Sequence, residues 1–208
     1  MADDYQDLGT YERFPLLPNW VSQPESSYIM ARWLVNMPGT VDSLTSITDD
    51  APIIFSAKFM LYQKSDEYAF LDFFNDHRGR ANKFWIQHPS SCFILTKTAN
   101  LGGTSINCQP NKAHLNYQGY ERVYILMDNG DIITRKAGAV TYDPVDDEVD
   151  LELVTALDRD ITTTNYQMVG RMLLCRFEED NITVESHSSE VSEVECRFRE
   201  LVKEYSDV

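Results

Sequence analysis

The segment Ser65–Pro89 (SDEYAFLDFFNDHRGRANKFWIQHP) constrains the fold most, because it predicts one short helix in a chain that otherwise alternates strands and turns. Ser65 can cap the start of this helix, and Gly79 supplies the left-handed residue that ends many helices. Between them, apolar residues recur at helical spacing. We therefore expect an amphipathic helix over about residues 65–78, with these residues on its buried face: Phe70, Phe73, Phe74 and His77.

An aromatic strand is predicted directly after the helix. Lys83–Gln87 is rich in residues that favour strands, and Pro89 is expected to end it, because proline cannot donate a backbone hydrogen bond. We expect the helix to pack on a sheet through four aromatic side chains, which are Phe70, Phe73, Phe74 and Trp85.

The rest of the chain reads as short strands separated by turns. Glu121–Arg135 predicts a hairpin, since its central Asn129-Gly130 readily takes positive φ. Glu148–Val154 alternates apolar and polar residues, as a half-buried strand does. Further strands are expected at Tyr28–Val35, Val41–Ile47, Ile53–Tyr62, Cys92–Thr98, Met168–Phe177 and Ile182–Ser186.

The end of the chain is ambiguous between a helix and a strand. Val191, Val194, Phe198, Leu201 and Tyr205 fit one face of a helix, but alternate residues from Val194 to Phe198 fit a strand as well. We favour a strand that pairs with Met168–Phe177, followed by a short tail.

Together these elements predict a mainly β protein, either a β-sandwich or a partly closed barrel, with one flanking α-helix. Residues 1–208 are interpreted as a single domain with an N-terminal arm over about residues 1–24. The apolar part of that arm is Phe14–Trp20, where two prolines forbid regular strand pairing. Whether residues 143–208 form a separate sub-lobe stays open.

The charge of the chain argues against free nucleic acid as a specific ligand. The formal net charge is −15, whereas proteins that bind nucleic acid present a basic surface to the phosphates. Residues 143–208 alone hold 18 acidic and 6 basic residues. Such a surface is either a solvated acidic face or one that repels a passing polyanion.

No pattern of residues predicts catalysis, a cofactor or a metal site. The four cysteines (Cys92, Cys108, Cys175 and Cys196) are at least 16 residues apart, so they lack the paired spacing of zinc ligands and are expected to be free, buried thiols. The acidic run Asp143–Asp150 lacks the calcium-loop pattern. The acidic N-terminus shows no signal-peptide pattern, and no apolar run is long enough to span a membrane.

Two regions carry a resemblance to a known group of proteins. The first is the predicted strand, helix and strand across Ile53–Gln87, with the phenylalanine pair Phe73-Phe74, the basic turn Arg78-Gly79-Arg80 and the aromatic Phe84-Trp85-Ile86. The second is the ending, VGRMLLCRFEEDNITVES followed by VECRFRELVKEY. In both, the chain resembles the distal tail or tail-tip (minor tail) proteins of long-tailed bacteriophages.

This resemblance implies a tail-tube-like β fold and a structural role in the virion tail, without enzymatic activity. Proteins of this group form rings, commonly hexamers, that link the tail tube to the baseplate or hub. The expected partners are therefore other copies of the chain and other tail proteins, namely the tube, the hub and the tape measure. The protein would be made in the cytoplasm of the host bacterium, and DNA would pass through the lumen of the ring without specific binding.

Assembly of such a ring needs residues that bury surface between copies. Aromatic side chains dominate the binding energy of protein interfaces, and ordinary core packing is the alternative interpretation for each of them. The candidate interface residues are Phe14, Leu16, Leu17, Trp20, Tyr28 and Trp33.

Three alternatives stay open at this point. The chain could be another tail part, such as a tube subunit or a terminator. It could instead be a carbohydrate-binding β-sandwich that stacks sugar rings on exposed tryptophans during attachment to the host surface. An enzyme acting on the cell wall is a third class, for which Asp158 and Asp160 are a conceivable carboxylate pair.

Overall fold

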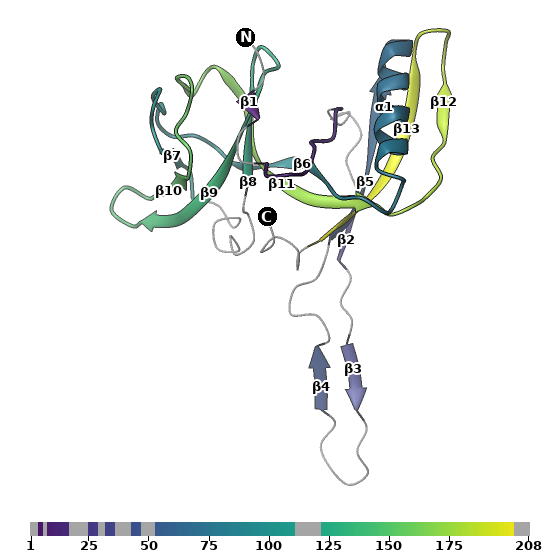
Figure 1. Cartoon of the computed structure of the whole chain (residues 1–208). Helices are drawn as coiled ribbons and strands as arrows, with labels where there is room; N and C mark the ends of the chain where they lie inside the picture. Colours follow the sequence, from purple (N-terminus) through teal and green to yellow (C-terminus); the bar gives the residue numbers. More distant parts are fainter. Residues whose placement is uncertain are drawn as a thin grey trace. The chain divides into compact units, whose positions relative to one another are not determined.

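The computed structural model describes residues 4–5, 8–16, 25–28, 32–35, 43–46, 53–110 and 122–201 (Figure 1). The fold is mainly β, with a single short helix in the described ranges and one large antiparallel sheet that is not closed into a barrel. The prediction of a mainly β chain with one helix is therefore confirmed.

The chain divides into two compact units. The first unit consists of Met1–Phe14 and Phe84–Leu173, and the second of Pro15–Lys83 and Leu174–Asp207. Residues 143–208, considered above as a sub-lobe, are thus shared between the two units.

The second unit is built on strands that pair in the order β2-β5-β13-β11, with β12 on β13. All of these pairings are antiparallel. Two more strands, β3 (Arg32–Val35) and β4 (Ser43–Ser46), pair with each other and with no other described strand. The bounds of the main strands are Glu25–Tyr28 (β2), Ile53–Leu61 (β5), Tyr166–Phe177 (β11), Val184–Ser186 (β12) and Ser192–Glu200 (β13).

The first unit contains the first part of β11, which pairs with β8, and the sheet then continues through β9, β10 and β7. Its core is a cluster of buried aliphatic and aromatic side chains that includes Phe93, Val123, Ile125 and Leu151. The bounds are Asp4–Tyr5 (β1), Phe84–Phe93 (β6), Ser105–Cys108 (β7), Arg122–Met127 (β8), Ile132–Asp143 (β9) and Glu148–Leu153 (β10).

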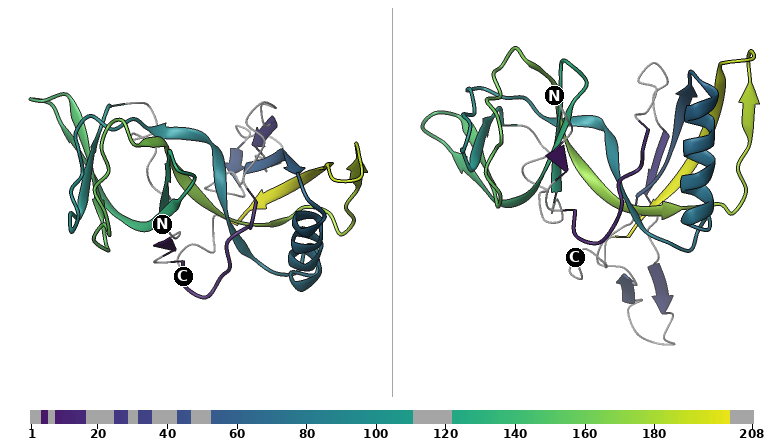
Figure 2. Two further views of the ribbon diagram at one scale, coloured as in Figure 1. Left: turned by 90° about the horizontal axis from the view of Figure 1, so that it is seen from above. Right: turned by 45° about the horizontal axis from the view of Figure 1, so that its top comes forward.

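Helix α1 spans Lys64–Asp76 and lies beside β5 and β13 in the second unit (Figure 2). The prediction of Ser65 as the cap is wrong: the cap is Gln63, whose backbone N–H donates to Asp66 Oδ2 at 3.2 Å. The buried face is as predicted, because Phe70 and Phe73 are buried and Phe74 packs edge-on to Phe177 with ring centroids 4.9 Å apart. The carboxyl-bearing first turn suits the positive end of the helix dipole.

The helix ends in a left-handed turn that is fixed by the start of the β11–β12 connection. Arg78 and Gly79 have φ of 50° and 57°, and Gly79 N–H donates to Phe74 O at 3.1 Å. The next residue, Arg80, donates its backbone N–H to Asp180 Oδ1 at 3.0 Å. A Cβ on Gly79 would lie 3.1 Å from Asp180 Cα, so glycine is required here both by its φ and by this close approach.

Several strand predictions are confirmed. Strands β8 and β9 form the expected hairpin, in which Gly130 takes φ of 87°. Strand β10 shows the predicted alternation of burial. Ser192–Glu200 form strand β13 rather than a helix, and its residues Phe198–Glu200 pair with Cys175–Phe177 of β11 as predicted. Residues 202–208, including Tyr205, lie outside the described residues.

Other strand predictions are wrong. Strand β6 does not end before Pro89 but continues to Phe93, so it takes in the start of the separate strand expected at Cys92–Thr98. Among the named strands β6 pairs only with β11, and a proline is tolerated on such an edge strand. Of the strand expected at Tyr28–Val35, Tyr28 lies in β2 and Arg32–Val35 form β3, while residues 29–31 lie outside the described ranges. The four-residue strand β7 was not predicted at all.

One buried amide in β6 lacks hydrogen bonds. Gln87 is fully buried, and neither its Oε1 nor its Nε2 has a hydrogen-bond partner.

We expect Gln87→Met to stabilise the protein by about 1 kcal/mol, because it removes an unsatisfied polar group at nearly the same volume. Gln87→Ala is the control and should destabilise it, because it leaves a cavity. Urea unfolding measures both, and a clear loss of stability in the methionine variant would contradict the assignment.

Gly79→Ala should destabilise the protein by about 2 kcal/mol or more, because it adds a steric clash to the strain of a positive φ. Gly130→Ala is the matched control, since Gly130 also has a positive φ but a Cβ there would meet nothing within 4 Å. We expect it to cost only about 1 kcal/mol. Urea unfolding midpoints compare the two variants, and equal losses would rule out the Asp180 contact as the cause.

Candidate functional site

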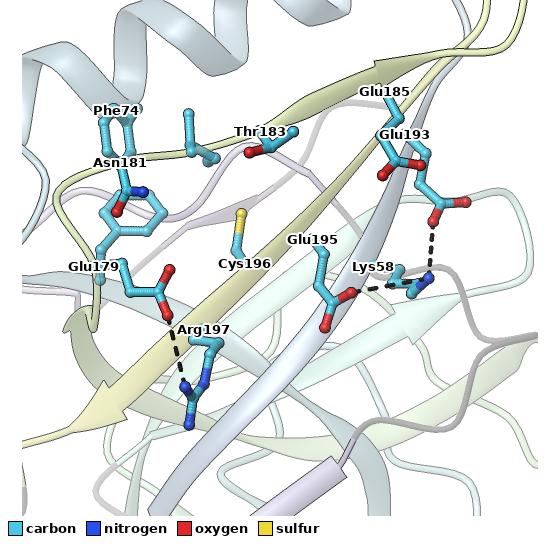
Figure 3. Close-up of a pocket in the computed structure, with 12 residues that line it drawn as sticks. Lys58, Phe74, Glu179, Asn181, Thr183, Glu185, Glu193, Glu195, Cys196 and Arg197 are labelled. Carbon is cyan, nitrogen blue, oxygen red and sulfur yellow. Dashed lines mark hydrogen bonds and ion pairs between the residues drawn. The ribbon is translucent and has the colours of Figure 1, made fainter.

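A cavity of about 400 Å³ lies in the second unit, beside strand β13 (Figure 3). Residues of the β11–β12 connection, β12, β13 and β5 line it, together with Phe74 from α1. Its volume lies within the range of about 300–1,000 Å³ that is usual for binding pockets. This cavity is the candidate functional site.

The cavity exists because the chain leaves the sheet between β11 and β12. Glu178 N–H still donates to Arg197 O at 2.8 Å, and β12 pairs again with β13 from Val184 onward. Between these points, residues 179–183 belong to no strand. The connection therefore bends away from the middle of β13 at Glu195 and Cys196, and leaves a space that the helix does not fill.

Apolar side chains form one part of the lining. They come from Phe74, Phe177, Ile182 and Cys196. Cys196 is buried, and burial raises the pKa of its thiol well above the usual range, so the sulfur stays protonated and is a poor nucleophile. This part of the lining can hold an apolar group and offers no reactive atom.

Charged side chains form the other part, and acidic groups are in excess. Lys58 Nζ lies 3.0 Å from Glu193 Oε1 and 3.9 Å from Glu195 Oε2, as the dashed lines in Figure 3 mark. The hydrogen bond that Lys58 donates to Glu193 raises the pKa of Lys58, so this lysine stays charged. The charged lining also includes Glu185, whose charge adds to the rise in the pKa of Lys58, and Glu179, whose Oε1 lies 3.6 Å from Arg197 Nη1.

Four carboxylates thus surround two cations, Lys58 and Arg197. The cavity is acidic beside an apolar surface, and this combination suits an organic cation with an apolar stem. In the described part of the chain, no group of three or more His, Cys, Asp or Glu residues is placed to hold a metal ion.

The residues predicted to join the helix to the sheet are placed in two different units. Phe70, Phe73 and Phe74 are in α1, and Phe73 meets Phe177 with ring centroids 6.4 Å apart. Trp85 belongs to the first unit, where its Nε1 donates to Leu8 O at 2.8 Å. The guanidinium of the buried Arg122 lies 4.7 Å from the centre of its ring.

The candidate interface residues differ in burial, and two of them lie outside the described residues. Phe14 is fully buried within its own chain, with its ring centroid 5.8 Å from that of Phe84, and its N–H donates to Trp85 O. Leu16 is half-buried. Leu17 and Trp20 lie outside the described residues. Tyr28 ends β2 and Trp33 lies in β3, strands of which the structure describes the backbone.

Acidic residues near Asp158 and in the run Asp143–Asp150 form contacts with other residues of the chain. Arg159 Nη1 lies 2.9 Å from Asp131 Oδ2, and Arg159 Nη2 lies 2.7 Å from Asp158 Oδ2. These contacts hold the pKa of Asp158 below its usual value. In the run Asp143–Asp150, Asp143 Oδ1 accepts a hydrogen bond from the N–H of Val145 and so shapes the β9–β10 turn.

Sequence reasoning did not find the residues of the cavity. One signal was available: once residues 192–200 are assigned as a strand, strand alternation puts Glu193, Glu195 and Arg197 on one face. Their partner Lys58 pairs with Glu195 across β5 and β13, 137 positions apart in the sequence, and no local pattern indicates that pairing. Of the cysteines expected to be free and buried, Cys108, Cys175 and Cys196 are confirmed as such.

Comparison with known proteins gives no identification, because no protein-family model and no curated protein matches this sequence. In the part of the chain that the structure describes, no helix is long and apolar enough to cross a membrane.

The ion pair that begins the cavity-lining connection should contribute to stability in a pH-dependent way. Arg199 holds Glu178 through two hydrogen bonds of 2.6 Å each, and it lowers the pKa of that carboxyl. A double-mutant cycle with Glu178→Gln and Arg199→Gln should give a coupling of about 1 kcal/mol at neutral pH.

Because the pKa of Glu178 is lowered in the folded state, this coupling is present above its unfolded pKa and is lost as the pH falls through the folded one. Urea unfolding from about pH 7 down to about pH 2 measures the change. Arg199→Lys is the control, since it keeps the charge but cannot form the two-pronged contact. A coupling that does not change with pH would contradict the assignment.

Proposed function

We propose that this chain is a structural protein of a bacteriophage tail, a ring-forming distal tail or tail-tip component that links the tail tube to the baseplate or hub. The observation that carries the proposal is the β3–β4 pair, a two-stranded sheet that joins no other described strand.

A two-stranded sheet of this size is at best marginally stable in water by itself. Strand β3 has the mostly apolar sequence Arg-Trp-Leu-Val, and within the described ranges it pairs only with β4. Such a pair needs further strands or another packed element to be stable, and a second copy of the chain can supply either. The pair therefore supports a protein whose strands are completed in an assembly, as expected for one subunit of a ring.

The order of the elements gives further support. The first region that resembles minor tail proteins folds into β5, α1 and β6, and the second contains β11 and β13. The acidic charge of −15 also fits a ring through which DNA slides, because carboxylates on the lumen repel phosphate.

The direct test is the state of the purified protein in solution. We expect sedimentation velocity to show a species of several copies, and negative-stain images to show toroids. A protein that stays monomeric at all concentrations up to about 100 µM, well above the dissociation constants of stable assemblies, would overturn the proposal.

Trp20→Ala should weaken the ring and leave the subunit folded, because aromatic side chains in an extended arm are typical interface anchors. Tyr142→Ala is the control, since it removes an exposed ring from the β9–β10 hairpin instead. Sedimentation measures assembly and circular dichroism measures folding. Unchanged rings in the Trp20→Ala protein would remove the arm from the interface while leaving the rest of the proposal in place.

A further inference from the structure

Three of the five exposed basic residues of the described chain are neutralised by ion pairs within it. These three are Lys64, Lys97 and Arg197. The other two are Arg78 and Arg80, for which no ion pair is recorded in the described ranges. In a chain with a net charge of −15, these are two exposed cations in a single turn. Arg80 also acts within the chain, because the pKa of Glu178 is lowered mainly by its hydrogen bond with Arg199 and in part by the charge of Arg80.

The turn that carries them is held in a defined conformation. Arg80 is fixed through its backbone by Asp180, and Gly79 is fixed by its hydrogen bond to Phe74 O. Arg78 takes a positive φ, which is unfavourable for a residue with a side chain. A rigid turn presents its side chains at a lower entropic cost of binding than a mobile loop does.

The cavity beside β13 has the complementary properties. Its exposed Glu185 and Glu195 are held only weakly by Lys58: Glu195 lies 3.9 Å from Lys58 Nζ, and Glu185 acts on Lys58 only through its charge. Apolar atoms of Phe74, Phe177 and Ile182 lie alongside these carboxylates. An arginine side chain needs both parts, because its aliphatic stem packs on apolar surface while its guanidinium binds carboxylate through two hydrogen bonds.

We propose that this cavity receives the Arg78-Gly79-Arg80 turn of a second copy of the chain. The inference rests on the proposed function, since it names one contact that would join the copies. The turn and the cavity are neighbouring sites on one subunit, because Gly79 approaches Asp180 while Glu179 and Asn181 line the cavity. In the proposed contact one copy provides the turn and the next copy provides the cavity, so the contact is heterologous. When such a contact is repeated from copy to copy, it closes into a ring if the rotation between copies permits.

The first experiment removes charge from either side of the contact. The double variants Glu185→Gln/Glu195→Gln and Arg78→Gln/Arg80→Gln should each weaken association by about tenfold or more in sedimentation equilibrium, because each leaves charged groups unpaired in the interface. The control, Asp72→Asn/Glu190→Gln, removes the same charge from exposed positions of the second unit outside the cavity and should associate as the wild type does.

The second experiment reverses charge and asks for recovery on mixing. A variant with Glu185→Arg/Glu195→Arg has both surfaces basic, and a variant with Arg78→Glu/Arg80→Glu has both acidic. Neither should associate alone, but an equal mixture should, because every contact between unlike copies then pairs opposite charges. Circular dichroism and unfolding midpoints show whether each variant is folded before mixing.

The outcomes separate this contact from the wider proposal. Recovery of assembly in the mixture supports the contact between the turn and the cavity. If the wild type forms rings while the neutral variants do so equally well, or the folded reversed variants do not recover on mixing, the contact is wrong and the ring proposal stands. If the wild type never associates, both are overturned.

Discussion

The backbone pairing of β13 is the constraint on which the second unit depends. Its residues pair with β5 along eight positions, from Ser192 to Arg199, and with β11 and β12 on the other side. The same strand places Phe198 against Phe55, Phe59 and Phe177, the aromatic cluster on which α1 packs. Because alternate residues of a strand point to opposite sides, the charged residues of the cavity follow from the same pairing. Removing β13 would therefore remove the core and the cavity of this unit together.

The sequence predicts the parts of this fold that local interactions determine. The β8–β9 hairpin depends on a glycine with positive φ at position 130, and the helix depends on phenylalanines three and four positions apart, so a short window contains each signal. Strand β6 was predicted wrongly, since whether a proline ends a strand depends on the neighbouring strand at that point. The helix cap is Gln63 and not Ser65, because β5 ends at Leu61 and the turn after it fixes where the helix begins.

The candidate site was out of reach for a different reason. Its residues come from β5, α1, the β11–β12 connection and β13, which only long-range pairing brings together. The sequence shows that the last third of the chain is acidic, but it does not show which carboxylates lie close together in the fold. Glu193 and Glu195 lie near Lys58, whereas Glu178 binds Arg199 and Asp158 binds Arg159. The cavity thus gathers four carboxylates around two cations, whereas Glu178 and Asp158 are each paired with an arginine elsewhere.

The contact between Gly79 and Asp180 joins the last turn of α1 to the connection that borders the cavity. Motion of one is therefore restricted by the other, and opening of the connection requires the helix terminus to fray as well. Amide protons at Gly79 and Arg80 would exchange with solvent more slowly whenever the cavity is occupied, even though neither amide faces it. Hydrogen exchange at this turn would thus report occupancy from outside the cavity, without a label placed inside it.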